Sequence, residues 1–439
     1  MSAPVRIVSR SAFTGSGGHA GRAPTPSPTS VLLAGEHFAV AILYLLAGSA
    51  GLVWIAPELA IGAYPSPHVA AVTHLFTLGW LTTTIFGALY QLLPVALGAP
   101  VRSVRMGHAS FCAFAPGAGI FAAGVATNST VLHHLGIALV ATGVVLAVVN
   151  FAISLRRATL RDVTWAAVVV ALGFLSIALV LGVVLLHNLR TGFLADARVR
   201  VLAVHLHMAL VGWALVMMTG VSHRLLPMFL LSHAPDTRWT KRALALLGIG
   251  VLALCVGLDA RIPAVTWIAL ALLEGGVGCF VWQVHSFYRA RVRRSIDAGM
   301  RFVVSALAFL VVSSALGAAV LARGISHPRL ATIYVMVGLL GGIVLFVIGF
   351  FYKIVPLLAW TVRYRDRLGK GTAPTVAATF SSRIAHLQLG LMSLGVAALA
   401  LGTAAGSTNA VRGGALLFLS GVLLFVSQIA RVALGRLHT

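Results

Sequence analysis

The sequence predicts an all-α polytopic membrane protein of about twelve transmembrane helices. Three observations predict this fold: the composition, the lengths of the apolar stretches and the distribution of the basic residues. Of the 439 residues, 59% are hydrophobic and only 9% are charged, whereas a soluble protein of this size carries about 25% charged residues. Because water cannot solvate so apolar a surface favourably, we expect a lipid bilayer around the chain.

Twelve apolar stretches follow one another along the chain, and each is close to or above the ~20 residues that span the hydrocarbon core. Strands are not expected, because the alternation of a membrane β-strand is absent. Residues 1–30 are rich in Ser, Pro, Gly and Arg and predict a disordered cytoplasmic tail. Residues 31–436 predict a single transmembrane domain. The apolar stretches cover residues 33–58, 68–96, 107–127, 131–155, 163–187, 199–229, 242–258, 263–288, 300–322, 328–360, 385–402 and 411–434.

The basic residues predict the orientation. The two tails and the even-numbered loops hold 23 Lys and Arg residues, and the odd-numbered loops hold seven. Basic residues gather on the cytoplasmic side, so both termini are predicted to be cytoplasmic, in a bacterial-type inner (plasma) membrane. Since these residues lie in short gaps between apolar runs, the net charge of +23 does not indicate a nucleic-acid partner. The three cysteines form no CxxC pair and are predicted to be packing residues.

A threefold internal repeat is the most informative feature of the sequence. The second, sixth and tenth apolar stretches contain THLFTLGWLTTTIFGALYQLLP, HLHMALVGWALVMMTGVSHRLLP and YVMVGLLGGIVLFVIGFFYKIVP. Aligned on their final prolines, they match at offsets of 133 and 129 residues, which brings His74, His207 and Met336 into register. The pattern predicts three repeats of about four helices, in three arcs with pseudo-threefold symmetry, at roughly 33–187, 199–322 and 328–434.

Two glycines in these segments, Gly79 and Gly212, each precede a tryptophan. Glycine lets another backbone or a flat ligand approach a membrane helix closely, so both are candidate cofactor-binding residues. The alternative is ordinary helix packing, since small residues are common in membrane helices.

Histidines gather near the predicted outer ends of the helices. An imidazole in lipid is costly, so it should face the bundle interior and have a partner there, and imidazole is also the commonest metal ligand. His74 and His207 should lie about 8–12 Å inside their helices, and His68 and His205 are further candidate metal ligands. The alternative for each is a capping or interfacial group, which we favour at the helix ends for His133, His134, His187 and His327.

Two further polar residues lie inside apolar stretches. Glu274 lies in the middle of the stretch 263–288 with no charged neighbour in sequence, and Tyr334 lies in the stretch 328–360. They are candidates for a proton relay. A neutral, hydrogen-bonded acid at position 274 is the other interpretation, and both stay open.

With these residues, the chain resembles the catalytic subunit I of the haem-copper oxidases, which include the nitric oxide reductases, and it is similar to the NnrS-type haem and copper membrane proteins. The resemblance covers nearly the whole membrane region. It implies haem ligands in the outer third of the second and tenth helices, where His74 and Met336 would form a His/Met axial pair of raised reduction potential. It also implies that His205 or His207 matches a copper ligand of the sixth helix.

The chain departs from this family at two helices. The seventh, ALALLGIGVLALCVG, lacks the family's His-His pair, and the tenth carries Tyr334 and Met336 where the family has His-x-His. A complete haem–copper centre for dioxygen reduction is therefore not expected. The resemblance implies haem, with copper as a second candidate, in respiratory electron transfer or nitric oxide metabolism. Because the histidines gather near the outer surface, an electron donor or partner subunit is expected on that side.

Two other classes of function use the same features. A transporter or channel also has internal repeats and intramembrane polar groups, and a non-catalytic structural subunit would leave the chemistry to a partner. Redox absorbance near the Soret band separates the haem protein from both.

Overall fold

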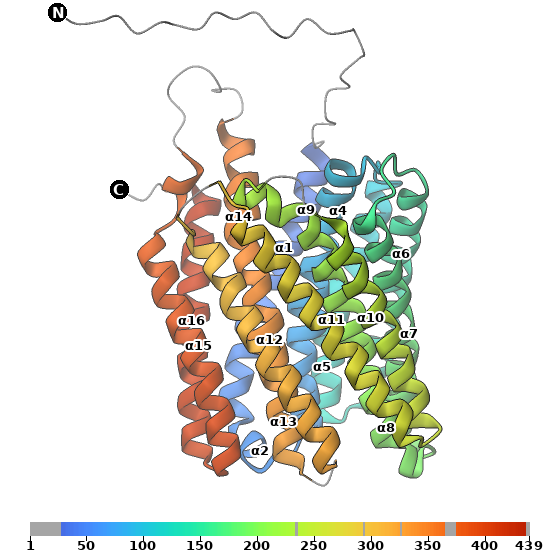
Figure 1. Cartoon of the computed structure of the whole chain (residues 1–439). Helices are drawn as coiled ribbons and strands as arrows, with labels where there is room; N and C mark the ends of the chain where they lie inside the picture. Colours follow the sequence, from blue (N-terminus) through green and yellow to red (C-terminus); the bar gives the residue numbers. More distant parts are fainter. Residues whose placement is uncertain (1–27, 233–235, 293–294, 325–326, 365–374, 436–439) are drawn as a thin grey trace, which may run out of the picture.

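Within the part of the chain that the structure describes, the protein is all-helical. The computed structural model describes residues 28–232, 236–292, 295–324, 327–364 and 375–435, so nearly all of the predicted tail 1–30 lies outside it. In these ranges twelve helices are long and apolar enough to cross a membrane (Figure 1). The predicted all-α fold of twelve transmembrane helices is confirmed.

Nine of the twelve spans are single α-helices, and the other three are composite helices that contain a π-helical segment. The single helices are α1 (Pro28–Trp54), α5 (Val104–Thr127), α6 (Thr130–Arg156), α7 (Val163–Thr191), α10 (Thr237–Asp259), α11 (Pro263–Arg289), α12 (Ala298–Arg323), α15 (Ser382–Ala405) and α16 (Thr408–Leu434). The α-helical parts of the composite spans are α3 (Pro67–His74) with α4 (Thr83–Leu97), α8 (Arg198–His207) with α9 (Val216–Leu230), and α13 (Pro328–Met336) with α14 (Leu345–Tyr364). Short elements between the spans are α2 (Ala56–Ile61), η2 (Ala195–Ala197) and η6 (Val376–Thr379).

The three π-helical segments give the sequence repeat a structural counterpart. They are η1 (Leu75–Thr82), η3 (Met208–Leu215) and η4 (Val337–Val344), each of eight residues. Each begins directly after one of the aligned residues His74, His207 and Met336, so the segments recur at the same offsets as the sequence motif. π-Helical turns are rare in proteins, and those that occur often lie at functional sites. The grouping of the helices into three arcs stays a prediction.

One glycine in each π-helical segment lies under an aromatic ring of the preceding membrane span, which is α1, α7 or α12. A Cβ atom added at any of the three would lie 2.5 Å from a ring carbon, much closer than the 3.5–4.0 Å of a carbon–carbon contact. The close approach predicted at Gly79 and Gly212 is therefore made by side chains of this chain. The pairs are Gly79 with Tyr44, Gly212 with Phe174 and Gly341 with Phe309.

Polar caps and glycines set the helix boundaries. Helix α5, for example, begins after Ser103, whose hydroxyl accepts a hydrogen bond from a backbone N–H of the first turn, and α15 ends at Gly406 in the left-handed conformation. Asp236 caps α10 in the same way, and the hydrogen bonds from Arg238 hold the pKa of its carboxyl below the usual value.

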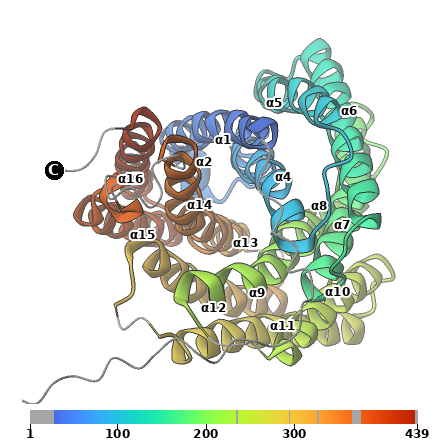
Figure 2. The same cartoon turned by 90° about the horizontal axis from the view of Figure 1, so that it is seen from above.

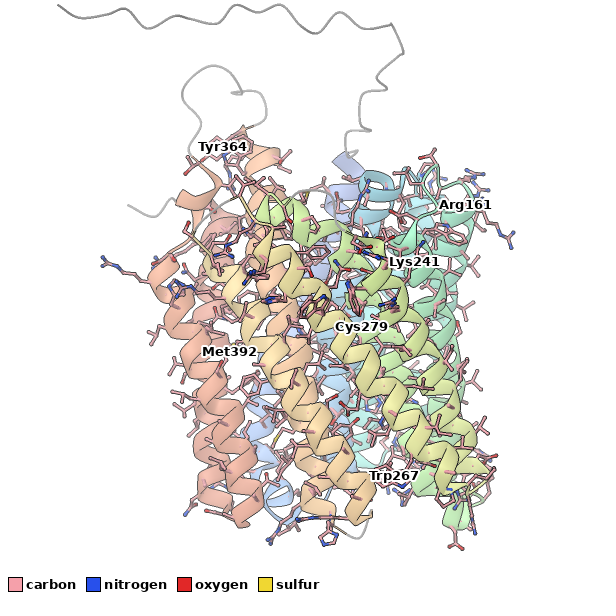
Figure 3. The ribbon with its side chains drawn as sticks, viewed as in Figure 1. Arg161, Lys241, Trp267, Cys279, Tyr364 and Met392 are labelled. Atoms are coloured by element: carbon pink, nitrogen blue, oxygen red, sulfur yellow. The ribbon has the colours of Figure 1, made fainter. Side chains whose placement is uncertain are left out.

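Seen along its axis, the bundle has helical hairpins at its periphery and the composite spans within (Figure 2). The helix pairs with the most extensive contacts are α5 with α6, α10 with α11 and α15 with α16. Helices α1, α7 and α12 pack against α4, α9 and α14 respectively. We call the end of the bundle at which α3, α8 and α13 begin the lower end (Figure 1). Arg161 and Lys241 lie toward the opposite, upper end, and Trp267 lies near the lower end (Figure 3).

Candidate functional site

His74 is the last residue of α3, directly before the π-helical segment η1. It lies seven residues beyond Pro67, the first residue of α3, or about 10 Å along the helix. Its Nδ1–H donates to the carbonyl oxygen of Ala70 at 2.7 Å. The imidazole ring lies edge-on to the ring of Phe121 at 5.0 Å between centroids and faces the ring of His205 at 6.4 Å.

His205 approaches His74 from the sixth span. Its Nδ1–H donates to the carbonyl oxygen of Ala178 on the neighbouring helix α7 at 3.0 Å. The ring lies against Gly182 of the same helix, where an added Cβ would be 3.3 Å from Cε1 of His205. The missing side chain at position 182 thus makes room for the imidazole.

The two histidines present the same chemistry. A carbonyl oxygen only accepts hydrogen bonds, so in each neutral ring Nδ1 carries the proton and Nε2 keeps the lone pair. Within the described residues neither Nε2 has a hydrogen-bond partner. Metal-ligating histidines commonly donate their other ring N–H to a carbonyl, which fixes the orientation of the ring. His74 and His205 are therefore two oriented imidazoles, each with an Nε2 lone pair that is available to a metal ion. The two residues are 131 positions apart in sequence, and the fold brings them together.

His207 points away from this pair. Two residues along a helix correspond to a rotation of about 200°, so His205 and His207 lie on nearly opposite faces of α8. The Nδ1–H of His207 donates to the carbonyl oxygen of Ala203 at 2.7 Å. Its Nε2 therefore accepts a hydrogen bond from the hydroxyl of Tyr334 at 3.0 Å, and the centroids of the two rings are 6.1 Å apart.

A cavity of about 460 Å³ lies on the His207 side of α8. Apolar side chains from α8, α10, α11, α12 and α13 make up most of its wall, and the polar groups that line it include His207, Tyr334 and Glu274. His207, Tyr334 and Glu274, which the sequence analysis predicted as candidate site residues on separate helices, thus line one cavity. Its volume is typical of a small-molecule pocket.

The predicted metal ligands do not converge. His68 lies in the first turn of α3, where its Nδ1 is 2.7 Å from Oε1 of Glu58 and its ring lies 4.6 Å from the ring of Trp54. His205 and His207 diverge as described. No three His, Cys, Asp or Glu side chains in the described ranges lie close enough to hold a metal ion together.

Met336, the predicted second haem ligand, is buried at the end of α13. Helix α13 packs mainly against α12, α15 and η4, whereas α3, which carries His74, packs mainly against α5 and η1. The pairing of His74 with Met336 stays a prediction.

Compared with protein-family models and with curated proteins, the chain gives no match. The resemblance to haem-copper oxidase subunit I therefore stays a prediction that rests on the residues quoted above.

The structure also shows contacts that the sequence did not indicate. Ala178, Gly182 and Phe121 support the two imidazoles, and the indole N–H of Trp213 donates to the hydroxyl of Thr82 at 3.2 Å. The last contact joins η1 to η3 within the bundle. The repeated Gly-Trp pair was the available signal for it, but only coordinates identify the acceptor.

Proposed function

We propose that this chain is a haem-binding membrane protein that transfers electrons, in which His74 and His205 would hold the haem iron. One observation carries the proposal: two imidazoles from different spans, each held by its Nδ1–H and each with an Nε2 that has no partner within the described residues, lie 6.4 Å apart between ring centroids. His205 replaces Met336, the partner that the family resemblance implied. Both histidines lie in the lower part of their spans, which would face outward in the orientation proposed below. The haem ligands of haem-copper oxidase subunit I likewise lie in the outer part of their helices.

The number of ligands favours haem over copper. A haem supplies four ligands to its iron from the macrocycle, so the protein needs to add only one or two axial residues. A copper site built by the protein uses three or more side chains, such as two histidines and a cysteine. The described residues bring two histidines together, and no three of their His, Cys, Asp or Glu side chains form a group that could hold a metal ion, so the pair matches what a haem needs from the protein.

Each residue around the pair has a definite role in this proposal. His74 and His205 would hold the iron, while the carbonyl oxygens of Ala70 and Ala178 keep the rings oriented and in the tautomer that exposes Nε2. A haem in this place would supply one-electron transfer. With both histidines holding it, such a haem would suit electron transfer in respiration or nitric oxide metabolism.

The charge distribution supports an orientation. Basic residues dominate the tails and the loops that join the spans at the upper end, where Arg161 and Lys241 lie (Figure 3). The upper end would then be cytoplasmic, in a bacterial-type inner membrane, and the lower end would face outward. Since the histidine pair is nearer the lower end, an electron donor or partner subunit would dock there.

Haem content of the purified full-length protein tests the proposal. We expect the wild-type protein to contain about one haem per chain, measured by the pyridine haemochrome assay. His74→Ala and His205→Ala should each lose most of this haem. His134→Ala is the matched control, because this exposed histidine bonds, among the described residues, only to the carbonyl oxygen of Thr130 in its own helix. A colourless wild-type protein, or full haem content in both variants, contradicts the proposal.

A further inference from the structure

The cavity beside His207 is separate from the proposed haem ligands, because His205 and His207 lie on opposite faces of α8 and neither His74 nor His205 lines it. It reaches from Thr266 and Gly324, near the lower ends of α11 and α12, to Val277 and Ile343, deeper in the bundle. A space of this size, lined mostly by leucine, valine and other apolar side chains, takes an apolar molecule that partitions into the bilayer.

Its polar groups add a specific requirement. The Tyr334 hydroxyl uses its single proton in the bond to Nε2 of His207, so only its lone pairs remain for a ligand. Both nitrogens of His207 are already bonded, one to Ala203 and one to Tyr334. The hydroxyl of Ser313 is likewise bonded to the carbonyl oxygen of Tyr334 at 3.1 Å. The tyrosine therefore offers an acceptor.

Glu274 offers a second acceptor. Within the described part of the chain its carboxyl group makes no hydrogen bond and no ion pair, although it lies in an apolar wall. A polar group without a partner in such surroundings is costly, and intramembrane carboxyl groups are commonly functional. A carboxyl oxygen accepts hydrogen bonds in either protonation state, so a ligand that donates a hydrogen bond to it would remove this cost.

We propose that the cavity binds a lipid-soluble phenol or similar hydroxylated molecule, whose apolar body fills the space and whose hydroxyl donates to Glu274 or Tyr334. A lipid acyl chain would fill the same volume but would leave both acceptors without partners. The two occupants differ in a measurable way, because only the hydroxylated one depends on these two side chains.

Binding of a matched pair of probes, naphthol and naphthalene, to the purified protein by calorimetry in detergent tests this inference. We expect wild type to bind naphthol roughly tenfold more tightly than naphthalene. Glu274→Leu and Tyr334→Phe should each weaken naphthol binding by about three- to tenfold and leave naphthalene binding unchanged. Glu274→Gln, which keeps an acceptor oxygen, should bind naphthol nearly as wild type does.

Two further variants make the outcome specific. Ala203→Phe places a ring in the cavity and should abolish the binding of both probes, while Gly278→Ala, at a site with no heavy atom within 4 Å, should change neither. Equal affinity of wild type for both probes, or naphthol binding that is insensitive to Glu274→Leu and to Tyr334→Phe, identifies a purely apolar occupant and overturns the inference. The absence of any binding of either probe to wild type also overturns the inference. Haem content measured on the same samples reports separately on the haem proposal.

Discussion

Replacing Gly212 by alanine should destabilise the protein through one identified contact. The new Cβ would lie 2.5 Å from Cγ and 2.8 Å from Cβ and Cδ1 of Phe174. Because ordinary carbon contacts need 3.5–4.0 Å, the ring or the helix must move by about 1 Å. Phe174 is only 5% exposed, so there is little space into which its ring can move. Overpacking of this kind costs about 1–3 kcal/mol, against a helix-propensity gain of at most ~1 kcal/mol for Gly→Ala.

The free energy of unfolding, measured by circular dichroism in mixed SDS micelles, checks this expectation. Gly173→Ala is the matched control on α7, because a Cβ at that position has no heavy atom within 4 Å. We expect Gly212→Ala to be about 1–3 kcal/mol less stable than Gly173→Ala. In a Phe174→Ala background the penalty of the Gly212 substitution should disappear, as a double-mutant cycle would show. Equal stability of Gly212→Ala and Gly173→Ala would refute the packing argument.

The threefold repeat extends this prediction to a ranking. The ring beside Gly79 belongs to Tyr44, whose hydroxyl donates to the carbonyl oxygen of Ala115 at 2.5 Å, so it cannot move without losing that bond. The ring beside Gly341 belongs to Phe309, which is only partly buried and can move outward. We therefore expect the cost of alanine to fall from Gly79 to Gly212 to Gly341.

Three other substitutions test separate parts of the structure. Gly182→Val should displace the His205 ring, since even a Cβ there lies 3.3 Å from it, and should lower haem content with both ligands intact. Trp213→Phe removes the N–H that bonds to Thr82 and should lower the free energy of unfolding by about 1 kcal/mol in SDS titrations. Arg161→Cys, in a background without the native cysteines, should react with an impermeant maleimide only from the cytoplasmic side, because it lies at the upper end.

Each of these has a control or an outcome that would count against it. Gly173→Val should keep full haem content, and equal haem loss in both glycine variants would show a general folding defect. Thr82→Val should cost less stability once Trp213 is phenylalanine, because only the bond from Thr82 to the carbonyl oxygen of Thr77 is then left to lose, so full additivity would deny the contact. Labelling of Arg161→Cys from outside intact cells would reverse the proposed orientation.

Much of the fold was predictable because it depends on local properties of the chain. Apolar stretches of sufficient length have to form helices in lipid, where every backbone polar group needs a partner within the segment. The motif containing Gly79 and Gly212 also predicted the spacing at which the composite helices recur. The π-helical form of those segments was not predicted, nor were the rings of Tyr44 and Phe174 that pack against their glycines, because both involve residues outside the motif.

The candidate site was predictable in composition but not in pairing. His74, His205, His207, Glu274 and Tyr334 all stood out as polar groups within apolar stretches. The divergence of His205 from His207 follows from helical geometry alone and was available from the sequence. Which distant group each one meets depends on the packing of helices that are far apart in the chain.

The electron paramagnetic resonance spectrum of the oxidised, purified protein tests the central claim most directly, because it identifies the axial ligands of a haem iron. Two imidazoles from His74 and His205 should give a low-spin ferric signal of the bis-histidine type, which changes in His205→Met and is unaffected by Met336→Leu. A histidine–methionine signal that is lost in Met336→Leu, or a spectrum without any haem signal, would contradict the account.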